Sequence, residues 1–98
     1  MELDEIKVLI AKRQYEVSQK VQELLEQEYF DKQDLENCIL TATRIHKRQR
    51  DERGTAADGR KYVIIGLDTH GRRFYMTGKI IKDHLGRLYF FITAHQAE

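Results

Sequence analysis

The positions of glycine and proline divide this chain into two kinds of structure. Proline is absent, and all six glycines lie after residue 53. Glycine weakens helices and proline breaks them, so the first half is free to be helical, whereas the second half carries the turn residues that separate short strands. We therefore predict an α+β protein, with about three N-terminal helices packed on one face of a C-terminal antiparallel sheet of roughly three to four strands.

Apolar residues repeat with helical spacing in three parts of residues 1–43. Ser18 and Asp31 are suitable N-caps for the second and third of these helices. Residues 13–17, RQYEV, are expected to be an extended joint; the alternative is one long helix that runs through them. The three apolar stripes are Leu3, Ile6, Leu9 and Ile10, then Val17, Val21, Leu24 and Leu25, and finally Leu35, Cys38, Ile39 and Ala42.

The second half of the chain is typical of strands separated by polar turns. RIHKRQR, residues 44–50, is a candidate edge strand, since charged edges resist unwanted pairing. A loop is expected at residues 51–59, and turns are expected at residues 68–71 and around Gly86. The remaining strands are predicted at residues 61–67, 72–81 and 87–94.

Composition indicates one globular domain, residues 1–98. The chain is 41% hydrophobic and 34% charged, which is unlike a disordered protein. No apolar run reaches the roughly 18–20 residues that span a membrane, and the acidic N-terminus is unlike a secretory signal. Cys38 is the single cysteine and lies on a helical stripe, so we predict a buried, unreactive thiol in a cytoplasmic protein.

Charge is distributed unequally between the two halves. Residues 1–43 carry five Lys/Arg and ten Asp/Glu, a balance of −5, whereas residues 44–98 carry twelve and six, a balance of +6. A basic C-terminal half favours an anionic partner, above all nucleic acid. The alternative is an acidic helical layer that simply packs beside a basic sheet.

The last hairpin is predicted to have two different faces, because side chains alternate along a strand. Gly78 either allows close approach of the helices or marks a bulge that moves Lys79 to the other face. The polar face combines rings and cations, which suit base stacking and phosphate binding; the alternative is a solvated face without a function. The predicted inner residues are Phe74, Met76, Ile80, Leu88, Phe90, Ile92 and Ala94, and the outer residues are Arg73, Tyr75, Thr77, Lys79, Arg87, Tyr89, Phe91, Thr93 and His95.

The outer residues supply the groups that a metal-independent ribonuclease needs. His95 would be the general acid or base, while Arg73 and Lys79 would bind the scissile phosphate. Substrate-binding roles are assigned to Tyr75, Tyr89 and Arg87, the tyrosines orienting or stacking the RNA.

No metal or cofactor site is predicted. Asp68 and His70 lie at one end of a strand and Asp83 and His84 at the other, about 35 Å away at roughly 3.3 Å per residue. Ser18 is the only serine, and its position at a helix start explains it. No glycine-rich phosphate loop precedes a helix.

Several short motifs extend across roughly Glu2 to Gln96. Tyr15 and Ser18 form a Y-x-x-S motif, Gly66 ends a strand, Gly71-Arg72 forms a G-R turn, and the last strand ends with residues 92–95, ITAH. In these features the chain resembles a family of small microbial domains of unknown function with Y-x-x-S-x-H-A, G-R and I-T-A-Y motifs, which is related to BrnT toxins and more distantly to RelE-type toxins.

The resemblance implies a RelE/BrnT-like fold, RNA or the ribosome as a target, and a cognate antitoxin as a partner. The chain departs from the family pattern at positions that the resemblance links to activity. Lys20 stands where the family has His, Glu28 where it has Arg, and His95 at the closing position, which is aromatic or Arg in the family. Lys20 is able to bind phosphate but is a poor general base, which favours a degenerate member.

Three hypotheses follow. The first is a toxin–antitoxin-related protein acting on RNA, either a ribonuclease or a degenerate relative. The second is a non-catalytic binding or regulatory module whose basic sheet face holds nucleic acid or an acidic protein partner. The third is a structural protein that pairs through a sheet edge near residues 44–50. The sequence leaves the oligomeric state open, a homo-oligomer included.

Overall fold

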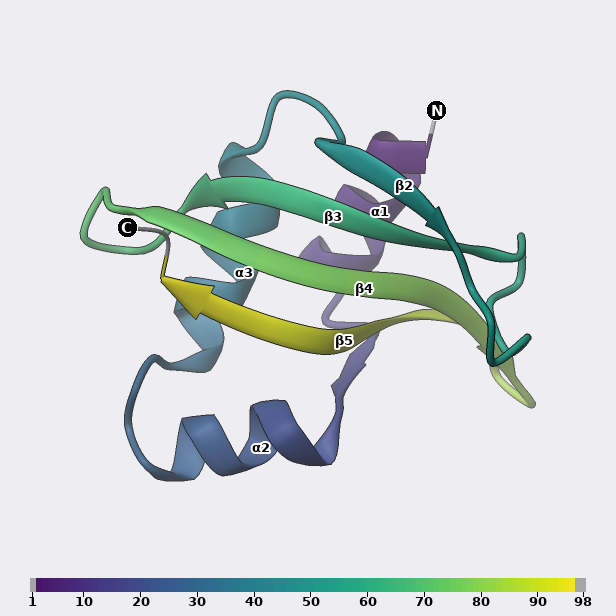
Figure 1. Ribbon diagram of the computed structural model, residues 1–98, viewed down its shortest axis with the longest axis horizontal. Coiled ribbons are helices and arrows are strands. Elements are labelled where there is room, and N and C mark those ends of the chain that lie inside the picture. Colours follow the sequence, from purple (N-terminus) through teal and green to yellow (C-terminus); the bar gives the residue numbers. More distant parts are fainter. Residues whose placement is uncertain (1, 97–98) are drawn as a thin grey trace.

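The computed structural model describes residues 2–96 and consists of three helices and a five-stranded sheet, with α1 and α3 on one face of the sheet and α2 beside its β1–β5 edge (Figure 1). The strand order in the sheet is β1-β5-β4-β3-β2. This arrangement confirms the predicted α+β class and the placement of helices before the main strands. The elements are α1 (Glu2–Ala11), β1 (Tyr15–Val17), α2 (Gln19–Glu26), α3 (Lys32–Thr41), β2 (Lys47–Arg50), β3 (Arg60–Leu67), β4 (Arg73–Asp83) and β5 (Gly86–Gln96).

The sheet contains the predicted C-terminal strands and one strand more. Strands β2, β3, β4 and β5 pair antiparallel, which confirms the predicted C-terminal sheet, and β1 adds a fifth strand that was not predicted and runs parallel to β5. The expected break between the first two helices is confirmed, but the joint is itself a strand. Its three residues pair Tyr15 with Tyr89 and Val17 with Phe91. Three residues are too few for hydrophobic alternation to indicate a strand.

Both predicted N-caps are confirmed, and Ser18 also ties its helix to the sheet. The Ser18 hydroxyl oxygen accepts a hydrogen bond from the Val21 backbone N–H at 3.1 Å and donates one to the Ile92 carbonyl of β5 at 2.8 Å. Asp31 caps α3 in a capping box with Asp34, in which each carboxylate accepts from the other residue's backbone N–H. The start of α2 is therefore held against the sheet.

The core lies between the helices and one face of the sheet. Cys38 of α3 is fully buried, as predicted, and burial raises the pKa of its thiol to about 12. A Cβ at Gly66 of β3 would overlap the Cys38 carbonyl oxygen, so only glycine allows α3 to approach so closely. The completely buried apolar side chains include Ile6, Val21, Leu35, Ile39, Tyr62, Ile64, Phe74, Tyr89 and Phe91.

A register shift in the β4–β5 pair changes which side chains of β5 enter the core. Thr77 pairs with Thr93, but Gly78 pairs with Phe91, so Ile92 is an extra residue in β5. The predicted outer placement of Tyr89 and Phe91 is therefore wrong, since both rings are fully buried. The register shift lies at Gly78, as the bulge alternative predicted, but the extra residue is in β5, so Lys79 stays on its predicted face. No helix approaches Gly78; the space there is taken by the ring of Tyr89 from β5, which a Cβ would meet at 2.5 Å.

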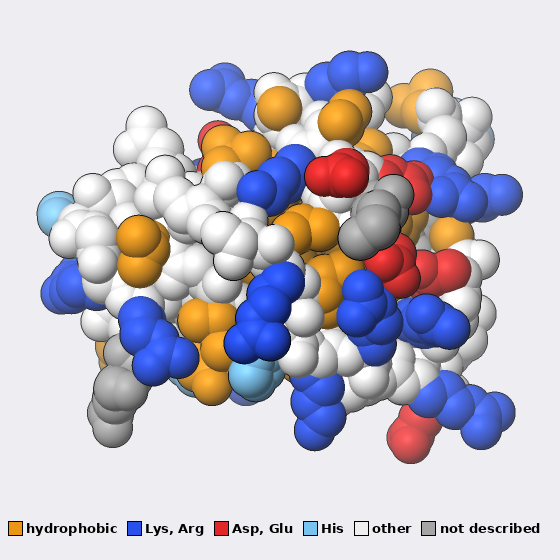
Figure 2. All heavy atoms as spheres, turned by 90° about the horizontal axis from the view of Figure 1, so that it is seen from above, with side chains coloured by type: hydrophobic (Ala, Val, Ile, Leu, Met, Phe, Trp, Pro, Cys, Tyr) orange, Lys and Arg blue, Asp and Glu red, His pale blue; other side chains and the backbone are white. Residues whose placement is uncertain are grey.

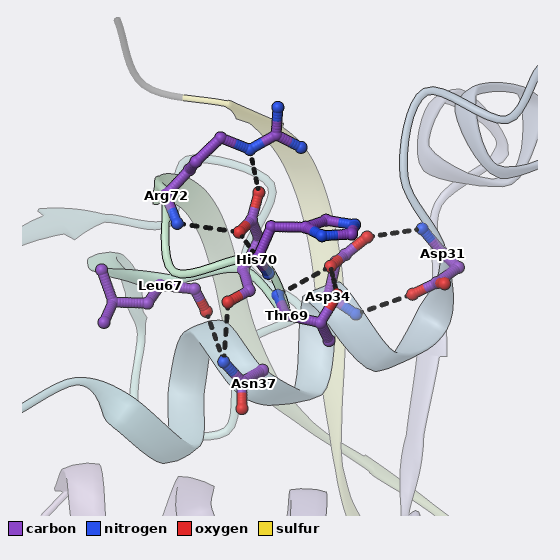
Figure 3. A network of polar contacts seen from close by, with 8 residues as sticks. Asp31, Asp34, Asn37, Leu67, Thr69, His70 and Arg72 are labelled. Atoms are coloured by element: carbon purple, nitrogen blue, oxygen red, sulfur yellow. Dashed lines mark hydrogen bonds and ion pairs between the residues drawn. The ribbon is translucent and has the colours of Figure 1, made fainter.

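The turn between β3 and β4 is fastened to α3 by a network of buried carboxylates (Figure 3). Asp34 of α3 accepts hydrogen bonds from both the backbone N–H and the hydroxyl of Thr69, at 2.9 and 2.7 Å. Asp68 accepts from the backbone N–H groups of His70 and Arg72 and pairs with the Arg72 guanidinium at 3.2 Å. Burial alone would raise the pKa values of Asp34 and Asp68, but these hydrogen bonds outweigh it and lower both.

Candidate functional site

The helices leave one face of the sheet uncovered, and we call it the open face. Figure 1 looks onto this face, with α1 and α3 behind the sheet. Strand β4 places Tyr75, Thr77, Lys79 and Ile81 here, because these residues alternate with the buried Phe74, Met76, Gly78 and Ile80. Strand β5 contributes Phe90, Thr93 and His95, the cross-strand partners of Lys79, Thr77 and Tyr75.

A groove of about 730 Å³ lies on the open face, between the start of α2 and the loop that follows β2. Its apolar lining comes from Ile81, Phe90 and Ile92 of the β4–β5 hairpin. The same groove is lined by cationic side chains from four parts of the chain, namely Lys20, Arg53, Lys61, Lys79 and Lys82. Two acidic residues, Asp51 and Glu52, complete its charged lining.

One of these cations, Lys79, is held in a buried ion pair. Its ammonium lies 3.3 Å from the Asp51 carboxylate, and the side chains are 6% and 1% exposed. Asp51 also accepts hydrogen bonds from the backbone N–H groups of Ala56 at 2.8 Å, Thr55 at 3.0 Å and Arg53 at 3.3 Å. Burial by itself would raise the pKa of Asp51, but these hydrogen bonds and Lys79 lower it. The pair therefore fixes the loop over the sheet.

The other groove cations are free to meet a ligand. Within residues 2–96, no acidic oxygen lies within 4.0 Å of the charged groups of Lys20, Arg53, Lys61 or Lys82. Together with the neutral Lys79–Asp51 pair, these side chains leave the groove with an excess of positive charge that only Glu52 reduces. Such a site favours an anionic ligand with an apolar part.

Arginines elsewhere on the molecule already have acidic partners. Arg48 and Arg60 lie 3.1 and 3.7 Å from the Glu2 carboxylate, and Arg87 lies 2.7 Å from Glu5. Hydrogen bonding to Arg48 lowers the pKa of Glu2 to about 2. Figure 2 shows the molecule from the side of β2, where Lys and Arg side chains are spread around a smaller group of acidic ones. The acidic first turn of α1 thus neutralises part of the basic sheet, as the packing alternative predicted.

The far end of the open face carries rings instead of lysines. The rings of Tyr75 and His95 are stacked, with centroids 5.1 Å apart and planes at 19°. His46, which precedes β2, meets Tyr75 edge-on at 6.5 Å. We call His46, Tyr75 and His95 the ring cluster. Sequence analysis missed His46, because its position depends on how β2 pairs across the sheet.

The residues predicted to share one catalytic site are spread along the open face. Arg73, Tyr75 and His95 lie toward one end, whereas Lys79 lies six residues from Arg73 along β4, a separation of about 20 Å. Of the predicted site residues, Lys20 and Lys79 line the same groove, apart from Arg73, Tyr75 and His95.

Two predicted substrate-binding residues face away from the open face. Arg87 pairs with Glu5 of α1 on the helix-covered side, so its predicted outer position is wrong. Tyr89 is sealed in the core, where burial raises its pKa well above the usual value. Both corrections follow from the extra residue Ile92, which reverses the alternation of the earlier part of β5.

Most residues on which the family resemblance is based make contacts that hold the helices and the sheet together. The Tyr15 hydroxyl donates to the Glu36 carboxylate of α3 at 2.5 Å, and its ring packs edge-on against Phe91 at 5.3 Å. Ser18 caps α2, and Gly66 makes room for α3. Glu28 follows α2 with a φ of 63° and is exposed, away from the groove. Lys20 and Glu28 both differ from the family pattern, but only Lys20 lines the groove.

Comparison with protein-family models, with curated proteins and with solved structures finds no match to this chain. Across residues 2–96, no group of three or more His, Cys, Asp or Glu is arranged to hold a metal ion. Over the same range, no helix is both long enough and apolar enough to cross a membrane.

Proposed function

We propose that this protein is a non-catalytic RNA-binding module that holds a single-stranded segment on the open face of its sheet. The observation that carries the proposal is the groove, where Lys20, Lys61 and Arg53, all without acidic partners among residues 2–96, surround an apolar floor that includes Phe90. Single-stranded nucleic acid binds best where cations follow its phosphates and a ring receives an unpaired base. A duplex presents no free base faces to such a floor.

The chemistry of the groove favours binding over cleavage. RNA cleavage needs a group that accepts the 2′-hydroxyl proton and another that donates to the leaving oxygen. The described groove lining contains no His, Cys or Tyr. Of its two carboxylates, Asp51 has a lowered pKa and is already bonded to Lys79, which leaves Glu52 alone for a reaction that needs two groups. The groove is therefore suited to hold a phosphate and poorly suited to move a proton.

This proposal agrees with a degenerate relative of BrnT or RelE-like toxins. Lys20 occupies the position of the family histidine, and a lysine retains the positive charge that attracts phosphate while losing the acid–base role. The relationship to those toxins rests on the short motifs of the sequence. We propose this relationship together with the RNA partner.

The test is fluorescence anisotropy with a labelled single-stranded RNA octanucleotide, measured over a series of salt concentrations. We expect binding whose logarithm falls linearly with the logarithm of salt, with RNA recovered intact. Lys20→Gln and Lys61→Gln should each reduce the salt slope by about 0.7–1. Arg87→Gln is the matched control, since Arg87 pairs with Glu5 on the other side of the sheet.

Other outcomes would identify a different function. No RNA binding, or binding that both lysine substitutions leave unchanged, rejects the proposal. Equal affinity for an acidic peptide would favour an acidic protein partner. Cleavage that is lost in His95→Ala and in Arg73→Ala would support the ribonuclease hypothesis, with the site at the ring-cluster end.

A further inference from the structure

The ring cluster has a geometry that exposes one aromatic face to solvent. Tyr75 is half-buried in the sheet, whereas the stacked His95 ring above it is exposed. His95 Nδ1 lies 3.1 Å from the Gln96 carbonyl oxygen, which accepts a hydrogen bond from it in the Nδ1–H tautomer. Because Tyr75 covers one face of the imidazole, the opposite face is available for a further ring.

The ring cluster and the groove lie on the same face and are separated by short polar side chains. Lys79 follows Tyr75 by four positions along β4, which corresponds to about 13 Å. The paired Thr77 and Thr93 lie between them. About four stacked nucleotides span this distance at roughly 3.4 Å each, and fewer do so if the strand is extended. The open face therefore has a ring at each end, Phe90 in the groove and His95 in the ring cluster, and a short oligonucleotide is long enough to reach both.

We infer that the ring cluster is a second subsite for the same RNA strand, in which an unpaired base stacks on the free face of His95. This inference rests on the proposed function and extends it from one groove to a strand of defined minimum length. Tyr75 is then a positioning residue, because it supports the imidazole without touching the base. Phosphate binding stays with the lysines of the groove, so the two subsites differ in their dependence on salt.

The experiment compares a dinucleotide with an octanucleotide of the same composition. A dinucleotide has one step between its bases and falls short of about 13 Å even when extended, whereas the octanucleotide reaches both subsites, so wild-type protein should bind the octanucleotide more tightly. His95→Leu should weaken octanucleotide binding about 5- to 100-fold, in the range known for loss of one base stack, while leaving dinucleotide binding unchanged. His95→Phe keeps a flat ring without an ionisable group and should retain most of the affinity.

Matched controls separate stacking from loss of structure. Tyr75→Leu should weaken octanucleotide binding and Tyr75→Phe should not, whereas Tyr29→Leu removes a ring that is 64% exposed in the connection between α2 and α3 and should change nothing. Each variant is accepted only if its thermal unfolding midpoint is close to that of the wild type. Should Tyr75→Leu fail that criterion, the His95 pair alone decides the test.

The outcomes distinguish failure of this inference from failure of the proposed function. If the dinucleotide binds in a Lys61-dependent manner but the octanucleotide gains nothing, the ring cluster is not a subsite and the proposed function stands. If neither RNA binds, the proposed function fails as well. If His95→Leu and His95→Phe weaken binding equally, His95 acts through its nitrogen atoms, and base stacking is rejected.

Discussion

The two faces of the sheet are built from the same strands but differ in whether their charged side chains have partners of opposite charge. On the helix-covered face, Tyr62, Ile64, Phe74 and Met76 pack into an apolar core, and charged groups at its margin are paired, as in Arg87–Glu5. On the open face, several lysines line a groove without acidic partners among the described residues. This difference in pairing supports the proposed ligand site in the groove, since unpaired like charges near one another are unfavourable without an anion between them.

The Lys79–Asp51 pair is the exception on the open face. It is almost fully buried, and it gives the loop of residues 51–59 a fixed position beside the groove. A pair of this kind contributes little net stability compared with an apolar pair but is costly to break. The open face thus combines one structural cation with several available ones.

The largest expected effect belongs to the covered face. Gly66→Ala would place a Cβ against the Cys38 carbonyl, and neither backbone can move without displacing α3 from β3. We expect a loss of more than about 3 kcal/mol in the free energy of unfolding, or no folded protein. Thr77→Ala on the open face is the control and should cost less than about 1 kcal/mol. Similar losses at both positions would mean that α3 does not pack as described.

The next effect comes from breaking the buried pair of the open face. Lys79→Met leaves the Asp51 carboxylate buried with only its backbone donors, and we expect a loss of about 2–3 kcal/mol in urea unfolding. The double variant Lys79→Met/Asp51→Asn removes both charges and should lose less than the sum of the two single variants. Strict additivity would contradict a direct interaction between the two side chains.

Buried carboxylates occur in both regions and make stability depend on pH. Asp34, Asp51 and Asp68 have pKa values below the ordinary one in the folded protein, so the unfolded chain binds protons more readily. Their contribution is complete above the unfolded pKa of about 3.9 and is lost as pH falls below it toward the folded values. Urea unfolding at neutral, mildly acidic and strongly acidic pH should show this drop, and Asp68→Asn should reduce it. A stability that rises on acidification would reject the described network.

Replacing single cations should have the smallest effect on stability and should show the clearest difference in RNA binding between the two faces. Lys61→Gln and Arg87→Gln both remove one positive charge from a sheet strand, and both should leave the thermal midpoint nearly unchanged because the side chains are not buried. Only Lys61→Gln should weaken RNA binding and lower its salt slope, by about 1. Equal effects of the two changes would show that binding follows net charge and not the groove.

Much of the fold could be predicted from local patterns. Ser18 and Asp31 are N-caps because short polar side chains at these positions complete the first turn of a helix, and Cys38 lies on an apolar stripe that only a core accommodates. The candidate site was harder to predict. Asp51 lies in a loop whose sequence does not indicate Lys79 as its partner, and His46 meets Tyr75 only across an intervening strand.

By itself, the sequence determined the class of the protein, the order of helices before strands, the helix starts and the existence of a cationic, ring-bearing sheet face. These depend on residue spacing and on hydrogen bonds between near neighbours, which the chain specifies locally. The tertiary structure decided which rings and cations occupy that face. One extra residue, Ile92, reverses side-chain alternation in β5, burying Tyr89 and Phe91 and turning Phe90 to the groove. A period of two is inverted by a single insertion, and only pairing with β4 reveals it.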